Sequence, residues 1–178
     1  MSKQKEIILS GVGGQGLIVC GTLLGEAAVL FDGKKATLAS EYGVETRGTF
    51  AKSDVVVSEQ EIFYPEAVTP NLILCLAQVA YQRYQDFALE EEAVLVYDSD
   101  QVQAKEGAAN HIGFPILTMA RELGNPATAN IIAMGIVAKK TGIVTPDAAK
   151  KAIQRFFASR SQKVVDLNYK AFDAGYAL

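Results

Sequence analysis

A glycine-rich turn within the first sixteen residues constrains the fold of this chain more than any other sequence feature. Residues 7–10 form a short, mainly apolar run typical of a strand, and the turn Gly11-Val-Gly-Gly-Gln-Gly16 follows directly. Gly11, Gly13 and Gly16 match the pattern G-x-G-x-x-G, and Gly14 adds a fourth glycine. Glycines allow a tight turn and a close approach of the backbone to a ligand. The N–H groups that open the next helix favour an anion such as phosphate. The sequence therefore predicts a strand, a phosphate-binding turn and a helix.

The turn alone leaves its ligand open. A dinucleotide-binding fold needs an acidic residue at the end of the second strand, and Glu41 lies slightly late for that role, directly before Tyr42-Gly43. Gln15 brings an amide with two donors and one acceptor to the start of the helix, where it would serve either a local hydrogen bond or a ligand. The glycines would also suit simple packing of a helix on a strand.

The composition limits the classes of protein to which the chain could belong. Its 178 residues suit a single domain, residues 1–178, with a substantial core. The formal net charge of −3 without a basic stretch argues against nucleic-acid binding. No apolar run reaches the roughly 18 residues that span a bilayer, and the polar N-terminus is unlike a signal peptide.

The two cysteines, Cys20 and Cys75, do not form a C-x-x-C motif, so we expect neither a disulfide framework nor a metal site. An iron–sulfur cluster held by this chain alone is excluded for the same reason, because such clusters usually take four thiolates. This cysteine usage is typical of a cytoplasmic protein.

Periodicity and breaking residues predict an α/β order of elements. A strand at residues 49–58 follows the preceding loop without a crossover helix, which favours an antiparallel pairing. We expect residues 101–114 to be a loop. These elements predict a three-layer α/β/α, Rossmann-like fold whose mostly parallel sheet is mixed at one edge. The expected strands are residues 7–10, 35–40, 49–58, 71–77 and 93–97, and the expected helices are residues 15–31, 78–87, 116–123, 128–140, 145–158 and 162–176.

A second candidate site lies in the polar segment Glu45-Thr-Arg-Gly48, which we expect to form an ordered loop. Arg47, next to Gly48, could bind a phosphate or carboxylate with its forked guanidinium group. The alternative is an exposed ion pair between Glu45 and Arg47, which would contribute little to stability. Short polar loops beside a strand end often carry binding sites, and this favours the functional interpretation.

Three further polar residues are candidates of a weaker kind. Asn130 and Asn168 lie on apolar helical stripes, where a buried amide must find hydrogen-bond partners, so a core role is favoured over a ligand or interface contact. His111, the only histidine, has no acid or nucleophile at motif spacing, and we expect it at the surface. The sequence shows no nucleophile elbow, no H-E-x-x-H and no Walker lysine, so no catalytic residue is assigned.

With these motifs in view, the chain resembles the γ subunit of 2-oxoacid:ferredoxin oxidoreductases, which also occurs as a domain of the single-chain pyruvate enzymes. Thr49 departs from the pattern, because the family usually has a second glycine after Arg-Gly. Four stretches carry the resemblance, namely Gly11-Val-Gly-Gly-Gln-Gly16, Tyr42-Gly-Val-Glu-Thr-Arg-Gly48, Gly124-Asn125 with Asn130 and Gly135, and Asn168 with Ala171-Phe172 and Gly175.

The resemblance implies a reaction in which a 2-oxoacid is decarboxylated on thiamine diphosphate, its acyl group passes to coenzyme A, and its electrons pass through 4Fe-4S clusters to ferredoxin. It places thiamine diphosphate, Mg and the clusters in the partner α, β and ferredoxin-like δ subunits, and it associates the γ chain with the coenzyme A side and with assembly. The short separate chain with Tyr42-Gly-Val-Glu leans toward 2-oxoglutarate among the 2-oxoacids.

The site residues expected for coenzyme A, or for an interface beside the partner's thiamine, are Gly11, Gly13, Gly14, Gln15, Gly16, Glu45, Arg47, Gly48 and Asn130. Self-association of the isolated chain is left open. Two other interpretations stay open at this point: a free-standing nicotinamide dinucleotide-binding enzyme, and a purely structural subunit whose glycine turn packs against a partner.

Overall fold

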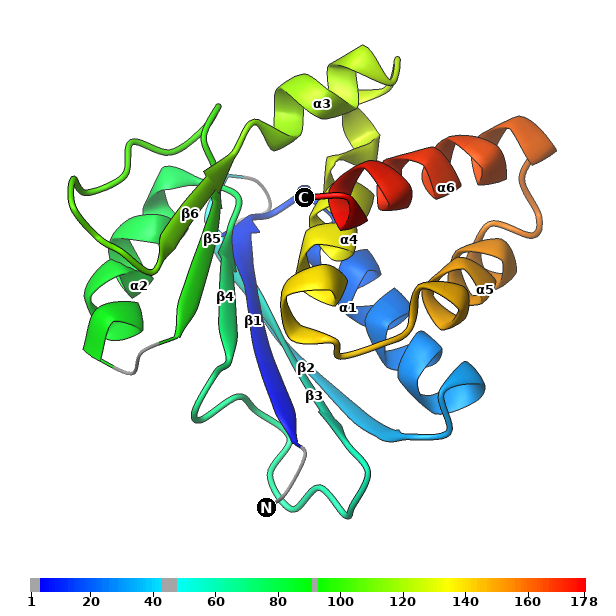
Figure 1. The fold of residues 1–178 in the computed structure, drawn as a ribbon, viewed down its shortest axis with the longest axis horizontal. Coiled ribbons are helices and arrows are strands. Elements are labelled where there is room, and N and C mark those ends of the chain that lie inside the picture. The colour runs from blue at the N-terminus through cyan, green and yellow to red at the C-terminus, as the bar shows by residue number, and fades with distance from the viewer. Residues whose placement is uncertain (1–3, 43–47, 91–92) are drawn as a thin grey trace.

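A six-stranded mixed sheet with helices on both faces forms the body of the molecule (Figure 1). The computed structural model describes residues 4–42, 48–90 and 93–178. The strands are β1 (Lys5–Val12), β2 (Lys35–Tyr42), β3 (Phe50–Ser58), β4 (Leu72–Cys75), β5 (Val94–Asp98) and β6 (His111–Phe114). The helices are α1 (Leu17–Glu26), which continues as the π-helical turn η1 (Ala27–Phe31), then α2 (Gln78–Glu90), α3 (Ile116–Glu122), the 3₁₀ turn η2 (Pro126–Thr128), α4 (Ala129–Thr141), α5 (Pro146–Phe156) and α6 (Gln162–Tyr176).

The strand order is β2-β3-β1-β4-β5-β6. β4, β5 and β6 continue parallel from β1, whereas β3 is antiparallel to both of its neighbours, β1 and β2. The predicted mixed edge is therefore confirmed, because residues 50–58 return beside β1 without a crossover helix. From β1, the connection through α1 leads to β2 and β3 on one side of the sheet, and the chain then crosses to β4, β5 and β6 on the other side. The order of the strands thus reverses at β1 and β4, where open α/β sheets commonly bind ligands.

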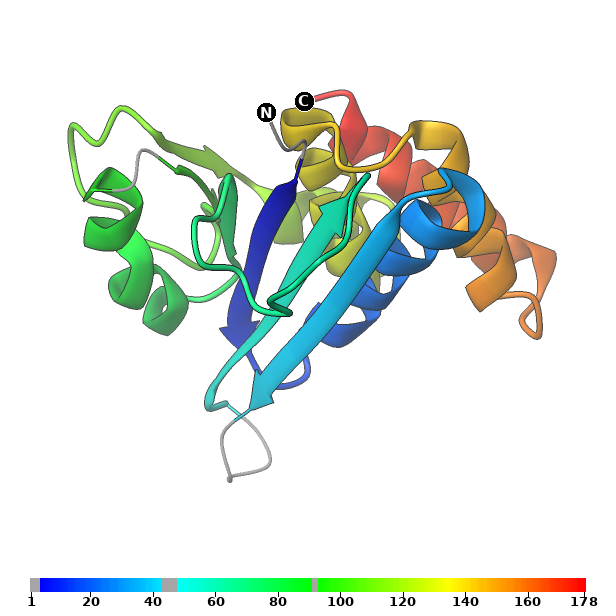
Figure 2. The same cartoon turned by 90° about the horizontal axis from the view of Figure 1, so that it is seen from below.

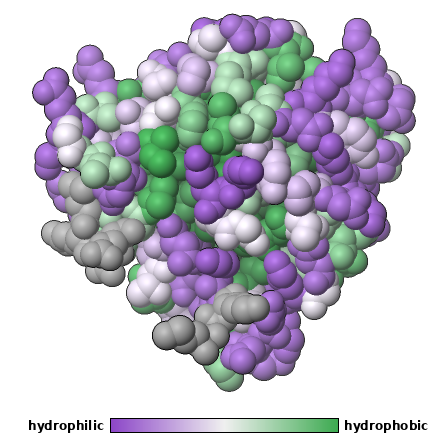
Figure 3. All heavy atoms as spheres, viewed as in Figure 1, coloured by the Kyte–Doolittle hydropathy of each residue, from purple (hydrophilic) through white to green (hydrophobic). Residues whose placement is uncertain are grey.

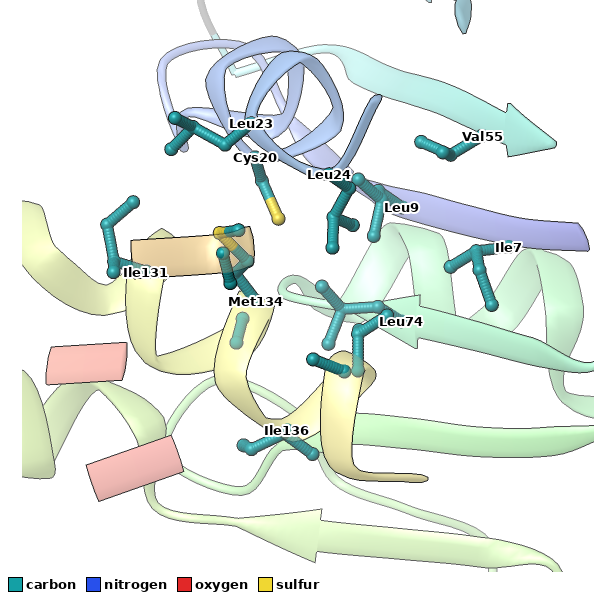
Figure 4. Close-up of a cluster of buried hydrophobic side chains, with 14 of the residues drawn as sticks. Ile7, Leu9, Cys20, Leu23, Leu24, Val55, Leu74, Ile131, Met134 and Ile136 are labelled. Carbon is teal, nitrogen blue, oxygen red and sulfur yellow. The ribbon is translucent and has the colours of Figure 1, made fainter. Parts of the chain in front are cut away.

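The main core lies between the sheet and the pair α1 and α4 (Figure 4). Side chains such as Leu24 of α1 and Met134 of α4 point toward those of Leu9 on β1 and Leu74 on β4. α5 and α6 pack outside this pair, with α5 against α1 and η1 and with α6 against α4. α2 covers the opposite face of the sheet over β1, β4 and β5. The predicted three layers are confirmed, with α5 and α6 added on the outside.

Two glycines bring α4 and α6 together closely. A side chain on Gly135 would overlap the Phe172 carbonyl oxygen, and one on Gly175 would overlap the carbonyl oxygen of Ile132. Both glycines are therefore required by helix–helix contact inside the chain. Asn168 lies buried in the same helix and donates to the Val164 carbonyl at 2.9 Å, which agrees with its expected core role.

The structure corrects the expectation for residues 101–114. His111–Phe114 forms the edge strand β6, which pairs in parallel with β5. Its four residues are all half-buried, so the alternation that marks an amphipathic strand is missing. The other predicted elements are present with ends shifted by a few residues.

His111 is not a surface residue as predicted. The ring is half-buried, and its Nδ1 lies 2.7 Å from the hydroxyl of Tyr81 on α2. Burial lowers the pKa of His111 below its usual value. The partner is thirty residues away in the sequence, so no local pattern could have indicated it.

Hydrophobic side chains lie over the middle of the face in Figure 3, and hydrophilic ones dominate around its rim. None of the helices in the described part of the chain is long and apolar enough to cross a membrane.

Candidate functional site

The glycine turn, residues 11–16, links the end of β1 to the start of α1 at the carboxyl edge of the parallel strands. Gly14 and Gly16 have positive φ angles of 94° and 75°, a backbone conformation that favours glycine. No side chain caps α1, whose first N–H groups lack partners within the helix by geometry. The predicted strand, turn and helix are therefore present in this order.

Gln15 holds the turn against the neighbouring strand. Its Oε1 accepts a hydrogen bond from the N–H of Val12 at 2.8 Å, and its Nε2 donates to the carbonyl of Leu76 at 2.9 Å. A side chain at Gly11 would overlap this amide, so glycine is required there to admit Gln15. The oxygen and the nitrogen of the Gln15 amide thus both have partners within the chain. This agrees with a local hydrogen-bonding role for Gln15 rather than with a ligand contact.

Asn130 supports the other end of the turn. Its Nδ2 donates to the carbonyl of Gly16 at 3.2 Å, and a side chain at Gly16 would overlap the Asn130 amide. Asn130 is buried in the first turn of α4, so it ties α4 to the start of α1. The structure therefore brings together two of the predicted site residues that lie more than a hundred positions apart.

Gly13 differs from the other glycines of the turn. Nothing lies within 4 Å of the position that a Cβ would take, and its φ angle is not positive. Its N–H donates to the carbonyl of Thr49 at 3.1 Å. Internal packing therefore explains Gly11 and Gly16 but gives no reason for a glycine at position 13.

Two cavities flank the turn. The outer cavity, of about 460 Å³, is formed by residues 12–19 together with Ala51, Lys52 and Ser53 of β3. The switch-point cavity, of about 260 Å³, lies on the inner side between the turn, Asp98, Gln101 and Asn130. Both are concave sites at the position in the fold where ligands commonly bind.

The loop predicted as the second site is only partly described. Glu45, Thr46 and Arg47 lie outside the described residues. Gly48, with a φ angle of 78°, and Thr49 follow directly, and Thr49 contacts Gly13 through the hydrogen bond above. The described end of the loop is therefore next to the glycine turn, as a joint site would need.

Two charged residues were not singled out from the sequence. Lys52 lines the outer cavity, and its Nζ lies 3.0 Å from Asp54 Oδ2 and 3.9 Å from Glu41 Oε2. Asp98 lines the switch-point cavity and accepts hydrogen bonds from the N–H groups of Asp100 and Ile116. Burial raises the pKa of Asp98. Their positions at or near strand ends were the only signal that could have indicated them.

The position of Glu41 argues against a nicotinamide dinucleotide site. In that fold the acidic residue ends the strand next to β1, but here β3 separates β2 from β1. Glu41 stands opposite Lys52 in the register and pairs with it. Within the described residues, no group of three or more His, Cys, Asp or Glu side chains could hold a metal ion.

Comparison with known proteins decides the family. Residues 6–178 match the family described as pyruvate ferredoxin/flavodoxin oxidoreductase. This chain belongs to that family. The resemblance to the γ subunits of 2-oxoacid:ferredoxin oxidoreductases is confirmed, and the chain is one subunit of a multi-subunit oxidoreductase rather than an enzyme by itself.

Similar proteins support the same assignment. The chain is 37% identical to the 2-oxoglutarate synthase subunit KorC of Methanocaldococcus jannaschii, over 97% of this chain and 92% of that one. It is 35% identical to KorC of Archaeoglobus fulgidus over 100% of this chain and 89% of that one. The crystal structure of the keto/oxoacid ferredoxin oxidoreductase γ subunit from Geobacter sulfurreducens is 34% identical, covers 98% of this chain and 95% of that one, and has a TM-score of 0.81.

Proposed function

We propose that this chain is the γ subunit of a 2-oxoglutarate:ferredoxin oxidoreductase, in which 2-oxoglutarate is oxidatively decarboxylated, coenzyme A takes the acyl group and ferredoxin takes the electrons. The observation that carries the proposal is the match along almost the whole chain to subunits named for 2-oxoglutarate synthase. A cytoplasmic location belongs to the same proposal.

The proposal assigns thiamine diphosphate, Mg and the 4Fe-4S clusters to the α, β and ferredoxin-like δ subunits. Both cysteines of this chain are buried, and burial raises the pKa of each thiol to about 12. Only a thiolate ligates iron, so buried thiols with this pKa are poor cluster ligands. The chemistry of these two side chains therefore supports electron transfer through partner subunits.

The proposal places the coenzyme A side of the reaction at the outer cavity. Gly13 leaves the backbone open there, and the first turn of α1 presents N–H groups that suit a diphosphate. Gly48 and Thr49 bring the end of the Arg47 loop to the same place. Arg47 would then add a forked cation for a phosphate of coenzyme A. Gly11, Gln15, Gly16 and Asn130 would act by holding the turn in position.

The test uses the complex assembled by co-expression with its α, β and δ subunits. Gly13→Ala and Arg47→Ala should each raise the apparent KM for coenzyme A about tenfold or more, with the KM for 2-oxoglutarate unchanged. Arg160→Ala, which removes an exposed arginine in the connection between α5 and α6, is the matched control. An unchanged KM for coenzyme A in both variants, with intact assembly, would remove the coenzyme A role. A complex that prefers pyruvate over 2-oxoglutarate would remove the proposed substrate.

The remaining alternatives predict different binding by the isolated chain. A nicotinamide enzyme should bind NAD and not coenzyme A in calorimetry. A purely structural subunit should bind neither, yet it should co-purify tightly with the thiamine and cluster subunits. The internal bonding of Gln15 is the observation that favours the structural alternative.

A further inference from the structure

An apolar groove runs between the outer side of α1 with η1 and the edge strand β2. In Figure 2, β2 lies in the foreground and α1 runs beside it. The groove has a volume of about 370 Å³, and its walls include Val29 and Leu30 on η1 and Leu38 on β2. These three side chains are 45%, 51% and 40% exposed. Several large apolar side chains exposed together on one surface mark a contact with another molecule.

Gly25 lies on α1 at the wall of the same groove. Nothing in the described structure comes within 4 Å of the position of a Cβ there, although glycine lowers the stability of a helix relative to alanine. Gly21, one turn earlier, is different, because a Cβ there would press on Leu38 and Val55. Internal packing thus explains Gly21 and leaves Gly25 unexplained. A backbone approached closely from outside would explain it.

Glu26 supplies a charge at the same place. It lines the groove, and its Oε2 is buried without a hydrogen-bond partner among the described residues. The closest cation is Arg155 on α5, whose Nε lies 3.8 Å away, beyond hydrogen-bonding distance. That oxygen is turned into the chain, but the Glu26 side chain as a whole is 33% exposed and gives the groove a negative charge. The groove would therefore best accept an apolar segment that carries a lysine or arginine.

The comparisons indicate where such a segment would come from. The ketoisovalerate oxidoreductase subunits VorA of two Methanothermobacter species match this chain over 94% and 97% of its length, but the match covers only 35% and 36% of theirs. In those proteins this unit is joined to about twice its own length of further chain. The same further chain would have to be a separate subunit in a complex built from this protein.

We propose that the groove between α1, η1 and β2 is the docking site for that separate partner subunit, through an apolar segment with a basic residue opposite Glu26. The inference rests on the proposed function, because it requires that this chain assembles as one subunit of an oxoacid oxidoreductase. Gly25 then allows the partner to approach the backbone of α1. Val29, Leu30 and Leu38 are covered in the complex.

The experiment co-expresses the chain, carrying an affinity tag, with its α, β and δ subunits and measures how much partner co-purifies. Val29→Asp and Gly25→Leu should each reduce the co-purified partner at least tenfold, and Glu26→Gln should reduce it by a smaller factor. Val79→Asp is the matched control, because Val79 is 42% exposed on α2, across the sheet, and this variant should retain the partner. Circular dichroism and thermal unfolding of each free variant establish that it is folded.

The outcomes separate this inference from the proposed function. If the unmodified chain fails to bind any partner, the proposed function fails, and the inference fails with it. If it binds but Val29→Asp and Gly25→Leu bind equally well, only the inference is overturned. If these variants instead abolish a homodimer of the free chain and leave the larger complex intact, the groove binds a second copy, which also overturns the inference.

Discussion

Two regions of this molecule use glycine for opposite reasons. Between α4 and α6, Gly135 and Gly175 are surrounded so closely by backbone atoms that no other residue would fit. On the outer side of the glycine turn and of α1, Gly13 and Gly25 face open space. The first pair is explained by the packing of this chain alone. The second pair has no internal explanation and points to molecules outside the chain. A glycine's surroundings, rather than its presence, therefore separate a structural requirement from a functional one.

The largest effect is expected from Gly175→Ala. The new methyl group would overlap the carbonyl oxygen of Ile132, and overpacking of this kind costs about 3 kcal/mol. For a chain of this size, that corresponds to a fall in Tm of about 6–12 °C. Thermal unfolding followed by circular dichroism measures it. A Tm within 2 °C of the original, a margin of roughly 1 kcal/mol or less, would show that α4 and α6 can separate easily and would weaken the comparison.

A smaller loss is expected from Gln15→Ala. The change leaves the N–H of Val12 and the carbonyl of Leu76 without their partners, at a cost of about 2 kcal/mol. Urea unfolding measures the difference in free energy. Gln154→Ala serves as a control, because that glutamine is exposed and accepts one hydrogen bond, from Tyr169. If the two variants were equally stable, internal packing would not explain Gln15. Gln15 would then resemble Gly13 and Gly25, and contact with a ligand would be the better explanation.

Gly25→Ala should act in the opposite direction to Gly175→Ala. The methyl group enters open space, and alanine is the better helix former, so the free chain should gain about 0.5–1 kcal/mol. The same urea titration measures the gain. A loss of stability instead would mean that the chain itself fills the space beside Gly25, and the contrast between the two pairs of glycines would disappear.

The smallest effect concerns the pH dependence of stability at Asp54. Burial raises the pKa of this carboxyl above its ordinary value of 3.8, although Lys52 opposes the shift. A raised pKa in the folded state means that the protonated form contributes stability. That contribution is complete below the unfolded pKa of 3.8 and is lost as the pH rises through the folded pKa.

Asp54→Asn removes this titration. The original chain gains stability at position 54 as the pH falls, and the variant lacks this contribution. Between pH 7 and pH 4, the change in the free energy of unfolding should therefore be less favourable for the variant than for the original chain. Urea unfolding across this range gives the difference. Parallel pH profiles for the two proteins would mean that folding leaves the pKa of Asp54 unchanged, which would contradict the raised pKa.

Local sequence signals predicted most of the fold. The Thr145-Pro146-Asp147 start of α5 is an example, since the hydroxyl of Thr145 accepts from the N–H of Ala148 as a helix cap does. The antiparallel return of β3 followed from the lack of a crossover helix. β6 was missed because a four-residue edge strand has too few buried positions to show a period. The pairing of His111 with Tyr81 was missed because it depends on tertiary structure alone.

The candidate site divides in the same way. The glycine turn was predictable from residue types, because positive φ and close approach select glycine wherever they occur. The partners of Gln15 and Asn130 were not readable, since Leu76 and Gly16 come next to them only when β4 and α4 are in place. Lys52 and Asp98 needed the strand ends to be known to within a residue. The roles of Glu45 and Arg47 stay predictions.

The position of β1 has a consequence for how the chain reaches its native state. β1 precedes the other strands of this sheet in the sequence, yet both of its neighbours come much later, with Ile7 paired to Val55 on β3 and to Leu72 on β4. Until β3 has left the ribosome, both edges of this apolar strand are unpaired, and one edge stays unpaired until β4 follows. Long-range pairing of this kind slows folding and exposes an aggregation-prone segment in the meantime. A chain truncated before β4 would therefore be expected to accumulate as insoluble material rather than as a smaller domain.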